Sequence, residues 1–212
     1  MSDITYVILD NRGLIGLGGE DVRDFLQGLV SNDVFKITKE NSQYAALLTP
    51  QGKFFYDFFL IETPEGLLLD CEADRLEELK RKLTMYKLRA KVELTTADDL
   101  CVFAVDGEQA PAAFDLAVET VTARQMGNGA AFVDPRSAEL GCRLIAPAAD
   151  AAAILDDLPL AEGTFEAYDT LRMRLGIPDG IRDMDVEKSI LLECNFDAFN
   201  GIDWEKGCYV GQ

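Results

Sequence analysis

The 212-residue sequence predicts an α+β fold built on antiparallel sheets. Strand-like apolar runs alternate with helix-like segments, and the joints between them are short. One joint, Pro50-Gln51-Gly52-Lys53, separates runs at residues 44–49 and 54–61, and its turn chemistry predicts a hairpin. No internal repeat or Pro/Ser-rich linker is visible. These features favour antiparallel sheets over a doubly wound parallel sheet.

The first elements are predicted from β-rich composition and helical spacing. Residues 4–9 are β-rich and precede the turn-like Asp10-Asn11-Arg12-Gly13. Val22, Phe25 and Leu26 have the spacing of one helix face, which predicts an amphipathic helix ending near residues 31–32.

A short strand at residues 67–71 is followed by a helix from about residue 73. Leu76, Leu79 and Leu83 recur at near-helical spacing. The outer face of this helix is basic and carries Arg75, Lys80, Arg81, Lys82 and Lys87. It is either a solvated face or a site for an anionic tail, such as the glutamates of a folate.

The rest of the chain continues the same alternation. Strands are expected at 89–94, 100–105, 118–123, 130–133 and 144–147. Helices are expected at 109–116, 149–158 and 164–175, and the last is followed by Gly176 and Pro178.

Composition and charge exclude several functions. Hydrophobic residues make up 48% and charged residues 27%, an ordinary globular balance. The net charge of −18 repels nucleic-acid phosphates and anionic membranes, so neither is expected as a direct partner. The absence of histidine excludes Ser-His-Asp and Cys-His catalysis and His-ligated metals from this chain.

Cysteine usage indicates a reducing compartment. The five cysteines are Cys71, Cys101, Cys142, Cys194 and Cys208. Their number is odd, none forms a C-x-x-C pair, and no apolar signal peptide precedes them. A cytoplasmic or organelle-matrix protein with reduced thiols is expected. Cys71, Cys101 and Cys142 lie in or beside apolar runs and are expected to be packing residues.

The last eight residues contain a cysteine, a lysine and two glycines. Gly207 and Gly211 flank Cys208 and permit a tight bend, and the Lys206 ammonium can stabilise the thiolate of Cys208. The plain alternative is a turn followed by a buried cysteine.

Two charged residues interrupt strand-like runs. Asp57 lies among aromatic neighbours, so it either faces water or serves a site. Arg143 is expected to pair with a carboxylate, and ligand contact is the alternative.

Several motifs resemble one known family. Lys206-Gly207-Cys208-Tyr209-Val210-Gly211-Gln212 resembles the K-G-C-[FY]-x-G-Q signature of the YgfZ family. Residues 24–33 resemble its F-L-Q-G-L-x-[TS]-N-D helix exit, and residues 47–53 its L-L-T-P-Q-G-[KR] hairpin. Shorter resemblances lie at 85–90, 134–136, 140–143, 172–178 and 193–195.

The resemblance implies a fold and a ligand. The family comprises folate-binding proteins tied to iron–sulfur cluster assembly and tRNA modification, and it is related to the glycine-cleavage T-protein (GcvT), an aminomethyltransferase. It implies two interleaved ferredoxin-like or GcvT-like subdomains around a central cavity that binds tetrahydrofolate. The expected parts are residues 1–95 and 96–212, whose boundaries can interleave. The family's C-terminal β-domain is expected to be missing from these 212 residues.

Two positions depart from the T-protein pattern. An adjacent aspartate pair after the hairpin becomes Tyr56-Asp57, and the pterin-gripping glutamate becomes Arg174. A carboxylate accepts the donor edge of a pterin, whereas a guanidinium can only donate. These departures argue against classical aminomethyltransferase chemistry, and whether the chain is an enzyme stays open.

The expected function is a folate-dependent accessory role in assembly or repair of [4Fe–4S] proteins, including tRNA-modifying enzymes. Cys208 is expected to be the functional thiol and Lys206 to lower its pKa. The resemblance suggests ligand contacts from Asp57, Arg143, Asn195, Gly207, Tyr209, Gly211 and Gln212. No resident metal site is expected, because a cluster commonly takes four thiolates, so iron–sulfur client or assembly proteins would supply the other ligands.

Three other functions remain open. A folate-dependent aminomethyl or other one-carbon transferase of the T-protein type would turn over a donor substrate. A structural adaptor would not need the Cys208 thiol. A redox-sensing thiol would need a resolving partner, for which Cys194 is the nearby candidate.

Overall fold

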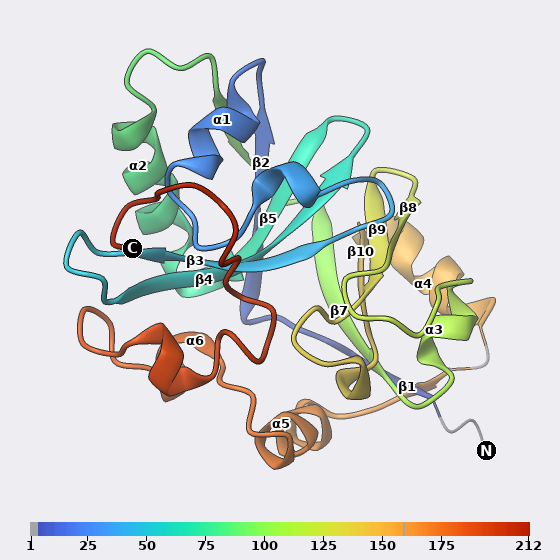
Figure 1. Cartoon of the computed structure of the whole chain (residues 1–212). Coiled ribbons are helices and arrows are strands. Elements are labelled where there is room, and N and C mark those ends of the chain that lie inside the picture. The colour runs from blue at the N-terminus through green and yellow to red at the C-terminus, as the bar shows by residue number, and fades with distance from the viewer. Residues whose placement is uncertain (1–3, 159) are drawn as a thin grey trace.

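Two sheets form the centre of the molecule, and helices cover their outer faces (Figure 1). The computed structural model describes residues 4–158 and 160–212. Strand pairing in both sheets is antiparallel apart from one parallel pair at the edge of the second sheet. The α+β class with antiparallel sheets, predicted from the sequence, is confirmed.

The first sheet is built from the first half of the chain. Its order is β3 (Gln43–Leu48), β4 (Phe54–Thr63), β5 (Gly66–Glu72), β2 (Arg12–Gly18) and β6 (Glu93–Thr96). The predicted hairpin joins β3 to β4, and Gly52 in its turn has φ of +77°, which favours glycine. Helices α1 (Val22–Gln27) and α2 (Leu76–Lys87) pack on the outer face.

The second sheet takes in the N-terminal strand. Its order is β11 (Ala161–Glu162), β1 (Thr5–Ile8), β7 (Leu100–Asp106), β10 (Cys142–Pro147), β9 (Gly129–Val133) and β8 (Ala123–Met126). Helices α3 (Ala110–Ala113) and α4 (Ala148–Asp156) lie on its outer side. The parallel pair is β1 with β11. The two halves of the chain therefore interleave through β1.

The remaining helices follow the second sheet in the chain. They are α5 (Phe165–Arg174) and α6 (Gly180–Asp183). Short 3₁₀ turns lie at Val34–Lys36, Ala73–Arg75, Ala138–Leu140 and Leu191–Cys194. The last segment of the chain then passes beside α1 and the β3–β4 hairpin (Figure 1).

Two predicted strands are wrong over most of their length. The strand expected at 89–94 begins only at Glu93, because Leu88 has φ of +45° and the Ala90 amide donates to the Lys87 carbonyl at 2.7 Å, which makes a turn after α2. Residues 118–123 were expected to be extended because of their β-rich composition, but the strand β8 begins only at Ala123. Val118 is 66% exposed, and Val121 has φ of +71°, which breaks strand geometry. The backbone carbonyl of Val121 instead accepts hydrogen bonds from the Ser42 amide and hydroxyl, which fixes this turn against the first sheet.

Apolar packing joins the two sheets. Phe59 of β4 and Phe132 of β9 are fully buried, and their ring centroids lie 6.2 Å apart. Tyr44 of β3 stacks on Phe196, with centroids 5.0 Å apart, and so connects this core to the C-terminal segment. Burial of one such side chain stabilises the fold by about 1.5–3 kcal/mol.

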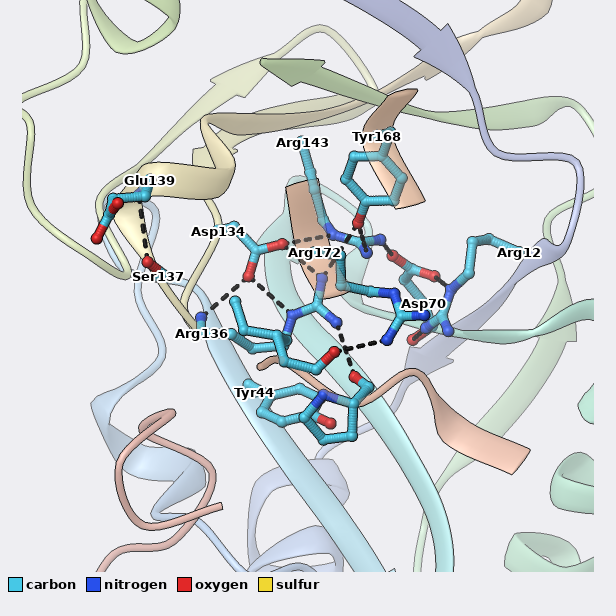
Figure 2. Close-up of polar contacts among 12 residues, drawn as sticks. Arg12, Tyr44, Asp70, Asp134, Arg136, Ser137, Glu139, Arg143, Tyr168 and Arg172 are labelled. Atoms are coloured by element: carbon cyan, nitrogen blue, oxygen red, sulfur yellow. Dashed lines mark hydrogen bonds and ion pairs between the residues drawn. The ribbon is translucent and has the colours of Figure 1, made fainter. Parts of the chain in front are cut away.

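Buried charges lie within this core (Figure 2). Arg12 of β2 donates to Asp70 of β5, with Nε and Oδ1 2.7 Å apart. The other oxygen of Asp70 accepts from Arg143 of β10 at 2.8 Å. One carboxylate thus links the first sheet to the second.

A second carboxylate completes this ion cluster. Asp134, which follows β9, accepts from Arg136 at 2.8 and 3.0 Å and from Arg143 at 3.2 Å. The Tyr168 hydroxyl accepts from the same two arginines. The Arg143 guanidinium lies 3.9 Å from the centroid of the Phe59 ring. The prediction that Arg143 pairs with a carboxylate is confirmed.

We expect the ion pairs of Asp134 to make folding acid-sensitive. Burial alone would raise the pKa of Asp134, but Arg136 and Arg143 outweigh it and lower the pKa from 3.8 to about 2. The folded state therefore gains about 2 kcal/mol from this carboxylate above pH ~4, and loses it as the pH falls through about 2. Asp134→Asn should lower the free energy of unfolding at pH 7 by about 3–5 kcal/mol, because two buried cations lose a partner. Urea unfolding measures both effects.

The matched control is Asp98→Asn, which removes the same charge from an exposed loop position. A loss of stability in the control equal to that of Asp134→Asn would contradict the role of the ion cluster.

Candidate functional site

Cys208 lies in a loop near the C-terminal end of the described chain. Its side chain is exposed and the thiol is free. Residues 203–212 contain no helix or strand, so their position depends on contacts with other segments.

Lys206 provides one anchor for this loop. Its ammonium donates to the backbone carbonyls of Gln27, Val30 and Asn32, which surround the exit of α1. These carbonyls lie at and after the C-terminal end of a helix, where a cation is favoured. Burial lowers the pKa of Lys206 to about 8, and Asp33 opposes that shift.

Gly211 provides a second anchor, on the β3–β4 hairpin. It has φ of +82°, and a Cβ atom at this position would lie 2.2 Å from the carbonyl oxygen of Thr49. The amide of Val210 also donates to the carbonyl of Gly28 at 3.1 Å. Gly207, in contrast, is exposed, and a Cβ atom added there would meet no other atom within 4 Å. The close packing therefore requires glycine at Gly211.

These contacts bring three sequence motifs together. The helix exit at residues 24–33, the hairpin at residues 47–53 and the motif at residues 206–212 are far apart in the chain but meet in the structure. The result is an exposed thiol on a loop held at both ends. The described residues hold no cluster of three or more His, Cys, Asp or Glu side chains suited to a metal ion. The effect of Lys206 on the thiol of Cys208 stays a prediction.

Asp57 belongs to a different environment. It is 4% exposed and lies in the middle of β4. The structure therefore excludes the alternative, left open by the sequence, in which Asp57 faces water. Its Oδ2 accepts from the Tyr44 hydroxyl at 2.8 Å, whereas its Oδ1 accepts no hydrogen bond from the described residues. Burial raises the pKa of Asp57, and Arg12 opposes that rise.

A second carboxylate lies close to Asp57. Glu72 accepts from the amide of Ile181 at 2.8 Å, and its pKa is raised by burial and by the charge of Asp57. A Cβ atom on Gly180 would lie 1.9 Å from Glu72 Oε1 and 3.1 Å from Asp57 Oδ1. The start of α6 therefore packs directly on these two carboxylates.

The other predicted site residues do not form one set with Asp57. Arg143 donates to Asp70, Asp134 and Tyr168 within the ion cluster (Figure 2). Asn195 is exposed and ends a 3₁₀ turn with φ of +58°.

Two C-terminal positions pack against their own loop. The Tyr209 ring is half-buried and lies 4.9 Å from the Lys206 ammonium, and burial raises the pKa of its hydroxyl. Gln212 is exposed, and its amide donates to the carbonyl of Tyr209 at 3.2 Å.

Sequence reasoning missed the residues that surround Asp57. Tyr44, Glu72 and Arg12 lie on neighbouring strands, and no local motif connects them to Asp57. The signal that could have found them was the strand pairing itself, because adjacent antiparallel strands place such side chains side by side.

The fold is that of a known class of enzyme. The chain superposes on the crystal structure of glycine cleavage system aminomethyltransferase T from Bartonella henselae with a TM-score of 0.68. The match covers 84% of this chain and 52% of that one, at 17% sequence identity. It shows a GcvT-like fold.

Similarity in sequence points to a narrower group of proteins than similarity in fold does. The chain is 34% identical to the iron–sulfur cluster assembly factor IBA57 homologue of Aspergillus oryzae, over 98% of this chain and 52% of the relative. It is 32% identical to IBA57 of Mus musculus, over 96% of this chain and 59% of the relative. Both relatives are named as mitochondrial proteins. The chain spans about half the length of these curated relatives.

Two further findings concern family models and membrane-spanning helices. No protein-family model matches the chain. Over residues 4–158 and 160–212, the structure has no helix of the length and apolarity needed to cross a membrane.

We expect Gly211→Ala to release the Cys208 loop. The new methyl group would collide with the Thr49 carbonyl, and φ of +82° is strained for alanine, at a cost of about 1–3 kcal/mol. The rate at which a thiol reagent modifies Cys208, together with amide hydrogen exchange over residues 204–212, should rise. Gly207→Ala is the control and should leave both rates unchanged. Equal rates in the two variants would contradict this account of the loop.

Proposed function

We propose that this chain acts in iron–sulfur cluster assembly or repair, with Cys208 as its functional thiol. The observation that carries the proposal is the exposed Cys208 on a loop anchored by Lys206 and Gly211. Similarity to the IBA57 assembly factors over nearly the whole chain supports it. Their mitochondrial names agree with an organelle compartment, one of the two locations expected from the cysteines.

The chemistry proposed for Cys208 is thiolate ligation of iron held jointly with another protein. An iron–sulfur cluster commonly takes four thiolates, and Cys208 supplies one. The partner, an iron–sulfur client or assembly protein, therefore supplies the remaining ligands. An exposed thiol on an anchored loop suits such sharing, because the sulfur is accessible while its backbone position is fixed. The clients include [4Fe–4S] enzymes, and the YgfZ-like signature favours tRNA-modifying enzymes among them.

We expect Cys208→Ser to abolish this support without disturbing the fold, because the side chain is exposed. The measurement is the activity of [4Fe–4S] enzymes in cells whose own copy of the gene is replaced by the variant. Thermal unfolding of the purified variant should match that of the unchanged protein.

Cys194→Ser is the control and should retain full support. Normal [4Fe–4S] enzyme activity in Cys208→Ser cells would favour a structural adaptor instead. Equal losses in both variants would favour a redox thiol pair.

Tetrahydrofolate binding is a second proposal, supported by one feature of Asp57. The Oδ1 atom of this buried carboxylate has no donor among the described residues. It could accept from the N–H edge of a pterin. Arg143 does not fit a folate contact, because its guanidinium is committed to the ion cluster.

Aminomethyl transfer is not part of this proposal. Arg174 occupies the position that the T-protein resemblance assigns to pterin recognition, and it lies exposed at the end of α5. A bound folate would bring its one-carbon chemistry, and this chain's own contribution would be the Asp57 acceptor.

We expect calorimetric titration of tetrahydrofolate to show saturable binding that weakens at least about tenfold in Asp57→Asn, because the variant replaces a carboxylate acceptor by a mixed donor and acceptor. Tyr44→Phe is the control: it removes the internal donor to Asp57 but keeps the carboxylate, so binding should persist. The absence of binding to the unchanged protein would refute the folate proposal and leave the Cys208 proposal standing.

A further inference from the structure

A groove of about 830 Å³ is lined by neither Asp57 nor Cys208. Three segments that are distant in sequence form it: residues 32–43, the turn at Thr120–Val121 and residues 200–205. The Val121 carbonyl is fixed by Ser42, and Asn32 donates to the carbonyl of Asn200 at 2.7 Å. Its walls are therefore held in place by hydrogen bonds between the segments.

Gln43 in the wall carries an acceptor without a donor. The residue is 5% exposed, and its Nε2 donates to Asn32 Oδ1 and to the Asp33 carbonyl, at 3.2 and 2.7 Å. Those two bonds fix the amide orientation, so the opposite atom, Oε1, must be the acceptor. Oε1 is buried and has no partner among the described residues. Because Oε1 is buried, it can accept from a ligand only after the Gln43 side chain turns toward the groove, so the contacts of a ligand are expected elsewhere in the groove.

Two further groups in the groove are free to contact a ligand. Trp204 is 69% exposed, and its ring has no aromatic or cationic neighbour among the described residues. Glu205 is exposed, and its carboxylate has neither a hydrogen bond nor an ion pair in the described part of the chain. Lys36, the cation of the groove, is already paired with Asp203 at 2.5 Å.

These groups favour a cationic donor over an anion. An indole face attracts a cation, and a guanidinium can also stack on it in a plane. A carboxylate accepts N–H groups, and a guanidinium carries five of them. The net charge of −18 further raises the local concentration of cations.

We propose that this groove binds an arginine side chain presented by an extended segment of a partner protein. The guanidinium stacks on Trp204 and donates to Glu205, and the flanking backbone of the segment lies along the residues 200–205 wall. A groove of this volume holds several residues of such a segment. The inference goes beyond the proposed function and requires neither folate nor the Cys208 thiol.

Trp204 makes the test direct, because it is the one tryptophan in the sequence. The probe is the blocked tripeptide acetyl-Gly-Arg-Gly-amide, titrated while Trp204 fluorescence is recorded in the 212-residue protein. We expect a saturable change, which weakens as salt is raised. The matching peptide with citrulline keeps the planar shape but lacks the charge, and should bind at least about tenfold more weakly.

Variants separate the groove from the general acidity of the protein. Glu205→Gln should weaken binding of the arginine peptide several-fold, whereas Glu108→Gln removes the same charge from an exposed position in the β7–α3 connection and should not. Equal weakening by both variants, equal binding of the arginine and citrulline peptides, or no saturable change would each overturn the proposal.

Discussion

The ion cluster between the two sheets is the constraint on which the rest of the structure depends. Asp70 joins Arg12 of the first sheet to Arg143 of the second, and Asp134 holds Arg143 and Arg136 together. Each of these charges is strongly buried, so each has a large desolvation cost that its partners must offset. The two sheets can therefore pack in one relative position, the one in which every guanidinium meets a carboxylate. Apolar contacts such as Phe59 with Phe132 are less selective about register.

The motif at residues 206–212 holds separate segments of the chain together as well as carrying the Cys208 thiol. Lys206 satisfies three carbonyls left free at the exit of α1, and Gly211 permits close contact with the hairpin. Residues that the sequence presented as chemistry around Cys208 thus also have a packing role. The two roles are compatible, because anchoring the backbone leaves the Cys208 side chain exposed.

Local sequence patterns predicted the elements whose formation depends mainly on neighbouring residues in the chain. The β3–β4 hairpin follows from its turn residues, and α5 follows from an apolar stripe ended by Gly176. Residues 118–123 were mispredicted because their contact with Ser42 overrides β propensity. The pairing of Arg143 was predicted as a type of contact, but its partners come from strands distant in sequence. Adjacency likewise suggested Lys206 as a neighbour of the thiol, whereas the direction of its side chain depends on α1.

The place of β1 in the second sheet has a consequence for how the chain is made. β1 is synthesised before both of its neighbours, because β7 and β11 emerge roughly a hundred or more residues later. Domains generally fold as units during synthesis, from the N-terminus onward. The first sheet, within residues 12–96, can therefore form while β1 still waits for its partners. The loop that carries Cys208 is held by α1 and the β3–β4 hairpin, both of which emerge before it, so an ordered thiol reports that these earlier elements have folded.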